Sequence, residues 1–290
     1  MLSERIDRAR DFIVRNARLL ERRLFAFHFD GGEAEPVVRA LAAYQNSDGG
    51  FASGLEPDKR DPGGQPQDAQ FALETLDAVG ALDSILALRI CDWLETVTTD
   101  EGGVPYALPS LNAFPHAPWW EVKDTHPAAG LNPTAAIAGL LLKGRVRHPW
   151  VERANDYCWR AIEASNTREF HDLMPMIAFL EHAPDRPRAD RALARIAETV
   201  AAPGVVALDP AAEGYVQKPL DWAPMPDSFC RKLFSDAVLA EHLAALAVRQ
   251  GEDGAWPISW PPISPGVALE WGGVVTIKAL RTLKAYGAVG

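Results

Sequence analysis

The chain has 290 residues, 48% of them hydrophobic, so it can bury a large core as one big domain or as two ordinary ones. A formal net charge of −10 without any basic block argues against nucleic acid or an anionic membrane surface as the partner. The three cysteines, Cys91, Cys158 and Cys230, are widely spaced and form neither a disulfide framework nor a paired-cysteine zinc motif.

The N-terminal segment is charged where a signal peptide needs an apolar core. From Ile6 to Leu24 its apolar residues recur at intervals of three and four, which predicts an amphipathic helix. The longest uninterrupted apolar run, residues 135–142, is far too short to span a bilayer. We therefore expect a soluble protein of the cytoplasm.

Helical periodicity continues along the chain, whereas strand-like alternation is scarce. The fold class predicted from this pattern is all-α. The further predicted helices are residues 35–44, a segment starting at Pro66, a segment capped by Asp83, a segment from Asn132-Pro133 to Gly144, a segment opened by His148-Pro149, and residues 170–181, 188–201, 235–250 and 267–286.

Two glycine corners interrupt the helices. The first reads QNSDGGF, residues 45–51, and the second reads QGEDGAW, residues 250–256. A weaker copy contains Glu101, 53 residues after Asp48 and 152 residues before Asp253, which fits a repeat of roughly 51 residues. Two helices per repeat predict an array of helical hairpins, each burying its apolar face against a neighbour.

The residues of the corners suit a structural role. Glycine allows the left-handed backbone that ends a helix, while Gln and Asp side chains can satisfy backbone groups at helix ends. The aromatic residue that follows can seal the joint between two hairpins. We therefore interpret the corners as structural staples, which indicate a fold and leave the reaction open.

Two proline-rich segments, residues about 103–130 and 205–226, lack helical periodicity. Loops of this length in a compact domain are more often functional covers than plain connectors. They carry Trp119, Trp120 and Trp222 at places where no helix face requires a large ring. The alternative is that these rings plug the ends of the helical array.

The corners resemble the Q-x-x-D-G-(G/S/A)-(W/F) repeat of the squalene-hopene cyclase and protein prenyltransferase beta-subunit superfamily. The resemblance implies an alpha-alpha toroid, a single domain over residues 1–290 with a double ring of about five to six hairpins around an apolar cavity for isoprenoids. The segments PLDWAPMPDS and PISWPPISPGVALEW are also similar to small bacterial proteins described as prenyltransferase-like.

A class II terpene cyclase needs a buried, neutral carboxylic acid that protonates an alkene. The Asp-x-Asp-Asp motif of such cyclases is absent, so the acid would depart from the family pattern. The candidates are Asp68, Asp58 and Glu56 near the expected cavity mouth, and Glu270 at the start of the last long helix. Two alternatives stay open: Asp68 can be a helix N-terminal charge, and Lys59 with Arg60 can make residues 55–62 a paired, solvated loop.

Aromatic faces stabilise a developing carbocation once water is excluded. The candidate substrate-binding residues are Phe114, Trp119, Trp120, Trp222, Trp256, Trp260 and Trp271. We expect no metal site and no cofactor, except Mg²⁺ if the substrate carries a diphosphate. The nearest match to the prenyltransferase zinc ligands is Asp227 and Cys230 with His242, where Cys230 is more simply a small buried hydrophobe.

The leading functional hypothesis is an isoprenoid-handling enzyme that resembles a terpene cyclase. Its partner would be an apolar or isoprenoid small molecule, and the sequence predicts no oligomeric state. One alternative is a non-catalytic binder of an apolar or polyprenyl ligand in the same cavity. A second is a carbohydrate-active enzyme, which would need two carboxylates roughly 5 to 9.5 Å apart across a polar cleft.

Overall fold

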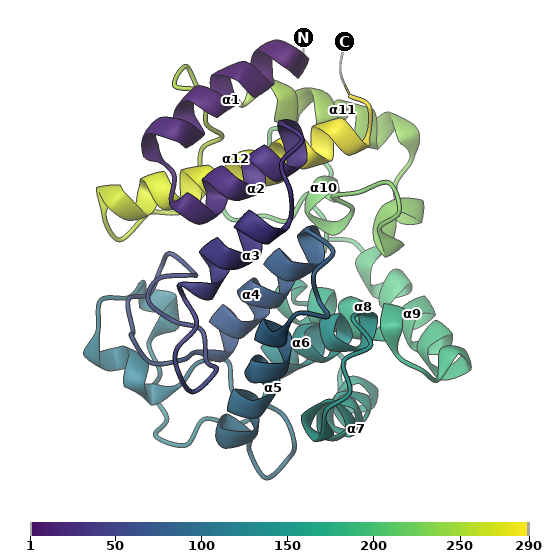
Figure 1. Cartoon of the computed structure of the whole chain (residues 1–290). Coiled ribbons are helices and arrows are strands. Elements are labelled where there is room, and N and C mark those ends of the chain that lie inside the picture. Colours follow the sequence, from purple (N-terminus) through teal and green to yellow (C-terminus); the bar gives the residue numbers. More distant parts are fainter. Residues whose placement is uncertain (1, 289–290) are drawn as a thin grey trace. The chain divides into compact units, whose positions relative to one another are not determined.

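The computed structural model describes residues 2–288, and its regular secondary structure is helical throughout that range. The helices alternate with loops along the chain, and β pairing is limited to isolated bridges between described residues (Figure 1). The all-α prediction is therefore confirmed. The chain divides into two compact units: a central unit of residues 38–196 and a terminal unit of residues 1–37 with 197–290.

The central unit is built from successive helices that follow the first corner. In chain order the helices are α3 (Glu35–Ala42), whose start belongs to the terminal unit, α4 (Pro66–Ala78), α5 (Ile85–Val97), η1 (Pro109–Ala113), η2 (Pro118–Trp120), α6 (Leu131–Lys143), α7 (Pro149–Ala164), α8 (Phe170–His182) and α9 (Arg186–Val200), whose last residues belong to the terminal unit.

Helix α6 is the core of the central unit, where α4, α7 and α8 pack against it. Its sequence TAAIAGLLL is apolar on nearly all sides, and Ala135, Ile137 and Leu141 are fully buried. A Cβ on Gly139 would lie 2.3 Å from the carbonyl oxygen of Ala178 in α8. Small residues thus allow α6 and α8 to approach closely.

The N-terminal helix is not continuous, so that prediction is wrong. It divides into α1 (Leu2–Asn16) and α2 (Leu19–Phe29), because the backbone is extended at Arg18, with φ −64° and ψ 164°. Asn16, a poor helix former, donates its side-chain amide to the Phe12 carbonyl at 3.2 Å and ends α1. The break turns the chain so that two short helices, rather than one long one, cover the same core.

The first residues of the other predicted helices agree with the structure to within a few residues. Pro66 is the first residue of α4, and His148 caps α7 by accepting from the Trp150 backbone N–H at 3.1 Å. Ser84 rather than Asp83 occupies the N-cap position of α5, without a side-chain capping bond, so the predicted cap is wrong by one residue. Ser and Asp both favour this position, which is why the pattern could not separate them.

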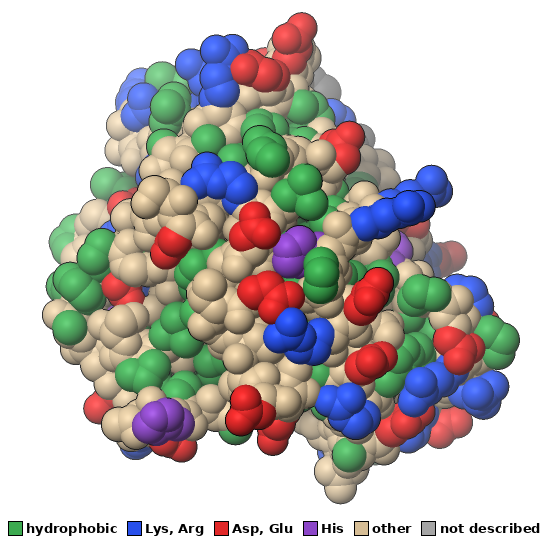
Figure 2. All heavy atoms as spheres, turned by 60° about the horizontal axis from the view of Figure 1, so that its bottom comes forward, with side chains coloured by type: hydrophobic (Ala, Val, Ile, Leu, Met, Phe, Trp, Pro, Cys, Tyr) green, Lys and Arg blue, Asp and Glu red, His purple; other side chains and the backbone are tan. Residues whose placement is uncertain are grey.

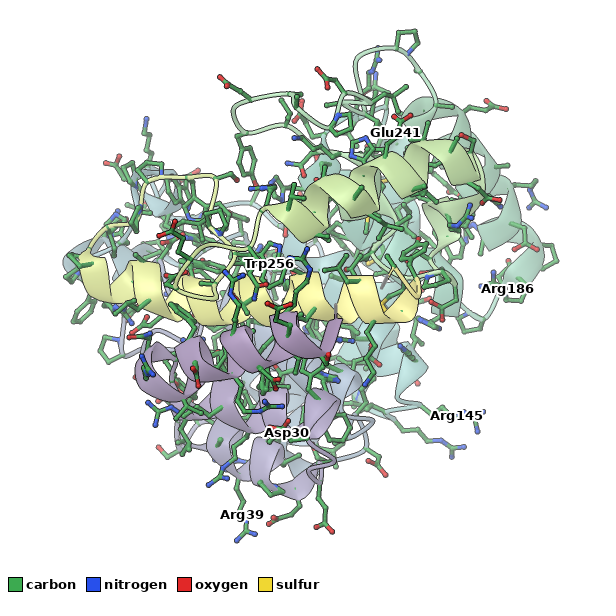
Figure 3. All side chains as sticks on the ribbon, turned by 90° about the horizontal axis from the view of Figure 1, so that it is seen from above. Asp30, Arg39, Arg145, Arg186, Glu241 and Trp256 are labelled. Atoms are coloured by element: carbon green, nitrogen blue, oxygen red, sulfur yellow. The ribbon has the colours of Figure 1, made fainter. Side chains whose placement is uncertain are left out.

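The terminal unit joins the two ends of the chain. Helices α1 and α2 pack against α12 (Pro265–Ala285), and α11 (Asp236–Val248) also contacts α12 (Figures 1 and 3). The short helices α10 (Pro219–Trp222) and η3 (Phe229–Leu233) precede α11. The core of this unit contains buried residues of α1, α2 and α12, together with Trp256 from the loop before α12; they include Phe12, Ile13, Phe25, Ile277 and Leu280.

The first corner, which follows α3, packs against α5. Gly49 has φ +98°, and a Cβ there would lie 2.1 Å from the Arg89 carbonyl oxygen in α5. The Gln45 side chain donates to the carbonyls of Gly49 at 3.0 Å and Leu86 at 3.1 Å. The corner therefore meets α5 at two backbone carbonyls, those of Leu86 and Arg89, which lie about one helical turn apart.

The second corner repeats this arrangement on a different helix. Gly254 has φ +93°, and a Cβ there would lie 2.2 Å from the Arg8 carbonyl oxygen in α1. The Gln250 side chain donates to the carbonyls of Gly254 and Arg5, both at 2.9 Å. The same residue types thus make the same contacts with α1 that the first corner makes with α5.

The surface shows no continuous patch of one charge on the face in Figure 2, where acidic and basic side chains are intermingled. None of the helices within residues 2–288 combines the length and apolar character needed to cross a membrane.

Candidate functional site

The start of α4 gathers buried polar side chains. Gln65 caps the helix in an extended conformation, Pro66 fixes the first turn, and Asp68 follows inside that turn. Asp68 is only 1% exposed, so it is a buried carboxyl at a helix N-terminus rather than a solvated one. The helix dipole favours a negative charge there, while burial opposes it.

The loop before α4 is buried as well, which corrects the interpretation of residues 55–62 as a solvated loop. Lys59 is 1% exposed, and its Nζ lies 3.2 Å from Glu56 Oε2 and 3.1 Å from Asp68 Oδ2. Asp58 is 2% exposed. We call Glu56, Asp58, Lys59 and Asp68 the carboxylate–lysine cluster; it brings together three of the four candidate acids.

Backbone groups fix the carboxyls of this cluster. Asp68 Oδ1 accepts the Glu56 backbone N–H at 2.8 Å, and Glu56 Oε2 accepts the Asp58 backbone N–H at 3.0 Å. The Asp58 carbonyl in turn accepts the Ala117 N–H at 2.8 Å. The loop is therefore held both by α4 and by the segment around residue 117.

Trp120 covers the lysine. Lys59 Nζ lies 4.5 Å from the centroid of the Trp120 ring, and the Tyr106 ring stacks on Trp120 with centroids 4.6 Å apart and planes 11° apart. Trp120 is thus in contact with both a cation and an aromatic ring.

Asp61, seven residues before Asp68, is buried in a different way. Its carboxylate accepts the Gly63 backbone N–H at 2.7 Å, the Gln65 side-chain N–H at 2.6 Å and the Ser110 hydroxyl at 2.7 Å. Neutral donors surround it, as expected for a structural carboxylate that orders the loop.

Burial shapes the protonation of the cluster. It raises the pKa of Glu56 from 4.5 to about 7; Lys59 opposes this shift, whereas Asp68 and Asp58 add to it. Burial likewise raises the pKa of Asp68, again against the attraction of Lys59. Glu56 and Asp68 touch the same ammonium, so they titrate as a pair. With a pKa raised to about 7, the Glu56 carboxyl is partly protonated at neutral pH.

The fourth candidate acid, Glu270, belongs to the terminal unit. It lies on α12 next to Trp271, whose ring makes an edge-to-face contact with Trp260 at 5.1 Å and 87°. Both rings are partly exposed. Two of the predicted aromatic residues are therefore adjacent in this unit.

The other predicted aromatic residues have different surroundings. Trp256 lies in the core beside α12, where its indole N–H donates to the Leu246 carbonyl at 2.8 Å (Figure 3). Trp222 is 1% exposed, whereas Phe114 and Trp119 are 37% and 44% exposed.

Three residues that complete the site were not among the predicted site residues. One of the two interpretations of the sequence places Lys59 in a solvated loop, and Tyr106 and Ser110 lie in a proline-rich segment without periodicity. The only sequence signal was the position of a lysine inside an acidic run. Within residues 2–288 no group of three or more His, Cys, Asp or Glu side chains is arranged to hold a metal ion.

Solved structures with a similar fold extend over nearly the whole chain. A protein from Actinoplanes is 15% identical with a TM-score of 0.59 and covers 99% of this chain and 100% of its own. A variant of the type II terpene cyclase MstE from Scytonema, bound to its substrate geranylgeranyl dihydroxybenzoate, is 16% identical with a TM-score of 0.52 and covers 98% of both chains.

Another MstE variant, without ligand, is 16% identical with a TM-score of 0.54 and covers 97% of this chain and 96% of its own. The sequence matches no protein-family model and no curated protein. At these identities the similarity shows the fold: the chain folds like a type II terpene cyclase.

Proposed function

We propose that the protein is an isoprenoid-handling enzyme that cyclises a prenyl chain by protonating an alkene. The observation that carries the proposal is the buried Glu56–Asp68 pair, which shares one lysine. A carboxyl that stays protonated near neutral pH is what such a reaction needs. The similarity of the fold to a type II terpene cyclase supports the same reaction class.

The reaction would proceed without a net change in composition. The electron pair of a terminal C=C bond takes the proton of one carboxylic acid, which leaves a carboxylate beside Lys59 and a cation on the neighbouring carbon. The next C=C bond attacks that cation and forms a ring. Loss of a proton from the last cation gives an alkene, so the product is an isomer of the substrate.

The proposed substrate has an apolar prenyl chain. The MstE variants bind geranylgeranyl dihydroxybenzoate and merosterolic acid A, which makes a prenylated aromatic acid a suitable first probe. No cofactor is required, and Mg²⁺ would enter only with a diphosphate. We place the protein in the cytoplasm.

We further propose that residues 1–290 form one alpha-alpha toroid. The second corner supports it: Gly254 docks against α1, the first helix of the chain, as Gly49 docks against α5, a helix of the following hairpin. A last corner that uses the first helix as its neighbour is what a closed ring of hairpins requires.

A non-catalytic binder is the second candidate, and Trp120 favours it. This ring already contacts a cation, Lys59, and stacks on the Tyr106 ring. Trp120 is therefore engaged by the protein itself rather than held ready for a carbocation. The carbohydrate-active alternative gains no support, because Glu56 and Asp68 contact one ammonium instead of facing each other across a cleft.

The test is product analysis by mass spectrometry after incubation with geranylgeranyl dihydroxybenzoate, polyprenyl diphosphates and squalene, with and without Mg²⁺. The proposal predicts a cyclised isomer that is lost in Glu56→Gln and Asp68→Asn. Asp77→Asn is the matched control, because it removes a carboxylate from the other end of α4, where Asp77 pairs with Lys143 at 2.7 Å. Tight binding of an unchanged probe would establish the binder instead.

A further inference from the structure

Lys59 holds an unusual position among the charged groups of the central unit. It is 1% exposed, and one ammonium contacts the carboxyls of both Glu56 and Asp68. One positive charge can compensate one carboxylate, and a second uncompensated carboxylate in a buried site is costly. Protonation of one carboxyl removes that cost.

We propose that Lys59 is a positioning residue that keeps one of the two carboxyls ionised and leaves the other as the acid. The inference rests on the proposed function for its catalytic meaning, but the sharing of one proton is a property of the cluster itself. Lys59 would act through Glu56 and Asp68, without touching the substrate.

Carboxyls from two segments of the chain contact or surround the Lys59 ammonium. Asp68 comes from α4, and Glu56 and Asp58 come from the same loop as the lysine. Asp61 lies in that loop too and acts on Asp68 through its charge. These four carboxyls are the titratable groups that face the ammonium or its partners from α4 and from this loop.

The segment of residues 103–130 closes the remaining side with a neutral ring. Trp120 covers the ammonium, and the backbone of Lys59 pairs with that of His116 in an isolated bridge. The His116 ring hydrogen-bonds the Phe114 carbonyl at 2.7 Å and is half-buried. The neighbouring backbone is fixed as well, since Arg60 donates its N–H to the Pro115 carbonyl at 2.9 Å. Lys59 therefore has little freedom to leave the two carboxyls.

Removal of the ammonium has a definite consequence. In Lys59→Met neither carboxyl has a cation nearby, so both hold protons to higher pH; an opposite charge at this distance typically changes a pKa by about 1 to 3 units. The pH above which activity falls would rise by about that amount. The maximal rate would fall, because a weaker acid donates its proton less readily.

The experiment compares the pH dependence of kcat for the wild-type protein, Lys59→Met and Lys59→Arg. We expect the alkaline limit to rise by about one pH unit or more in Lys59→Met and to return toward the wild-type value in Lys59→Arg. Lys143→Met, which removes a surface lysine paired with Asp77, should leave the limit unchanged. An unchanged limit in Lys59→Met would overturn the proposal, because a purely structural role lowers stability without moving this limit.

A second measurement separates this inference from the proposed function. Infrared titration of the carboxylic acid C=O band reports the shared proton without any substrate. The wild-type band should disappear as pH rises, and the Lys59→Met band should persist to higher pH. If the two bands differ in this way but the protein forms no cyclised product, the proposed enzymatic function is wrong and the role of Lys59 stands. If the wild-type and Lys59→Met bands titrate identically, the proposed role of Lys59 is wrong. If Lys59→Met does not fold, Lys59→Gln, which also removes the charge, carries the same prediction.

Discussion

The first corner and the carboxylate–lysine cluster lie within 24 residues of each other in sequence, yet they bury polar groups in different ways. In the corner, side chains bind backbone groups: Gln45 donates to two carbonyls, and the Asp48 carboxyl accepts the Gly50 N–H at 2.9 Å. In the cluster, charged side chains contact one another through Lys59. The corner has one carboxyl, whose partner is a backbone N–H, whereas a buried cluster with more carboxyls than cations must respond to pH.

The corner should show the largest effect on stability. Gly49→Ala places a Cβ 2.1 Å from a backbone oxygen at φ +98°, so we expect a loss of about 3 to 5 kcal/mol in the free energy of unfolding. Urea unfolding measures it. Gly80→Ala is the control: Gly80 has φ +69° but open space around it, so about 1 kcal/mol is expected. Equal losses in the two variants would show that the close approach to α5 does not matter.

The cluster should show the largest dependence on pH. The pKa of Glu56 is raised from 4.5 to about 7, so the folded state holds a proton that the unfolded state releases earlier. The stability that this group contributes is present below pH 4.5 and is lost as pH rises through 7, by up to roughly 3 kcal/mol. Glu56→Gln should flatten the fall in unfolding free energy over that range. A slope equal to that of the wild type would contradict the raised pKa.

The glutamine of the corner should have an intermediate effect. Gln45→Leu leaves the carbonyls of Gly49 and Leu86 without their donor, and we expect a loss of about 2 kcal/mol. Gln250→Leu should cost a similar amount, because Gln250 makes the equivalent two bonds. Gln70→Leu removes a single hydrogen bond to Glu74 on the surface of α4, so it should cost only a few tenths of the loss expected for Gln45→Leu. Different costs at Gln45 and Gln250 would break the equivalence of the corners.

The smallest effect is expected for a charge pair outside both regions. Asp77 and Lys143 join α4 to α6 at 2.7 Å, with side chains 27% and 44% exposed. Solvent and salt screen such a pair, so Asp77→Asn should change the free energy of unfolding by less than about 1 kcal/mol. The same unfolding titration at low and high salt measures it. A loss in unfolding free energy as large as that of Gly49→Ala would show that burial and close backbone contact do not determine which substitutions cost most.

The comparison also explains what the sequence could predict. The corner is local: its glycines, glutamine and aromatic residue are neighbours in the chain, and the helices beside it have clear periodicity and caps. The all-α class and most helix positions therefore followed from the pattern. The break at Arg18 did not, since apolar spacing continues through it.

The site was predictable only in part. Glu56, Asp58 and Asp68 stood out because they follow the corner and open α4. The burial of Lys59 depends on Trp120, which lies 61 residues further along the chain in a segment without periodicity. A contact at this distance leaves no local signal, so the lysine looked like part of a solvated loop.

The most direct test of the central claim is to run the reaction with geranylgeranyl dihydroxybenzoate in D₂O and to analyse the product by mass spectrometry and NMR. If the Glu56–Asp68 pair donates the proton that starts cyclisation, each product molecule should carry one deuterium at the protonated carbon. The product should disappear in Glu56→Gln and Asp68→Asn and persist in Asp77→Asn. A cyclised product without deuterium, or one formed equally well by all three variants, would contradict the account.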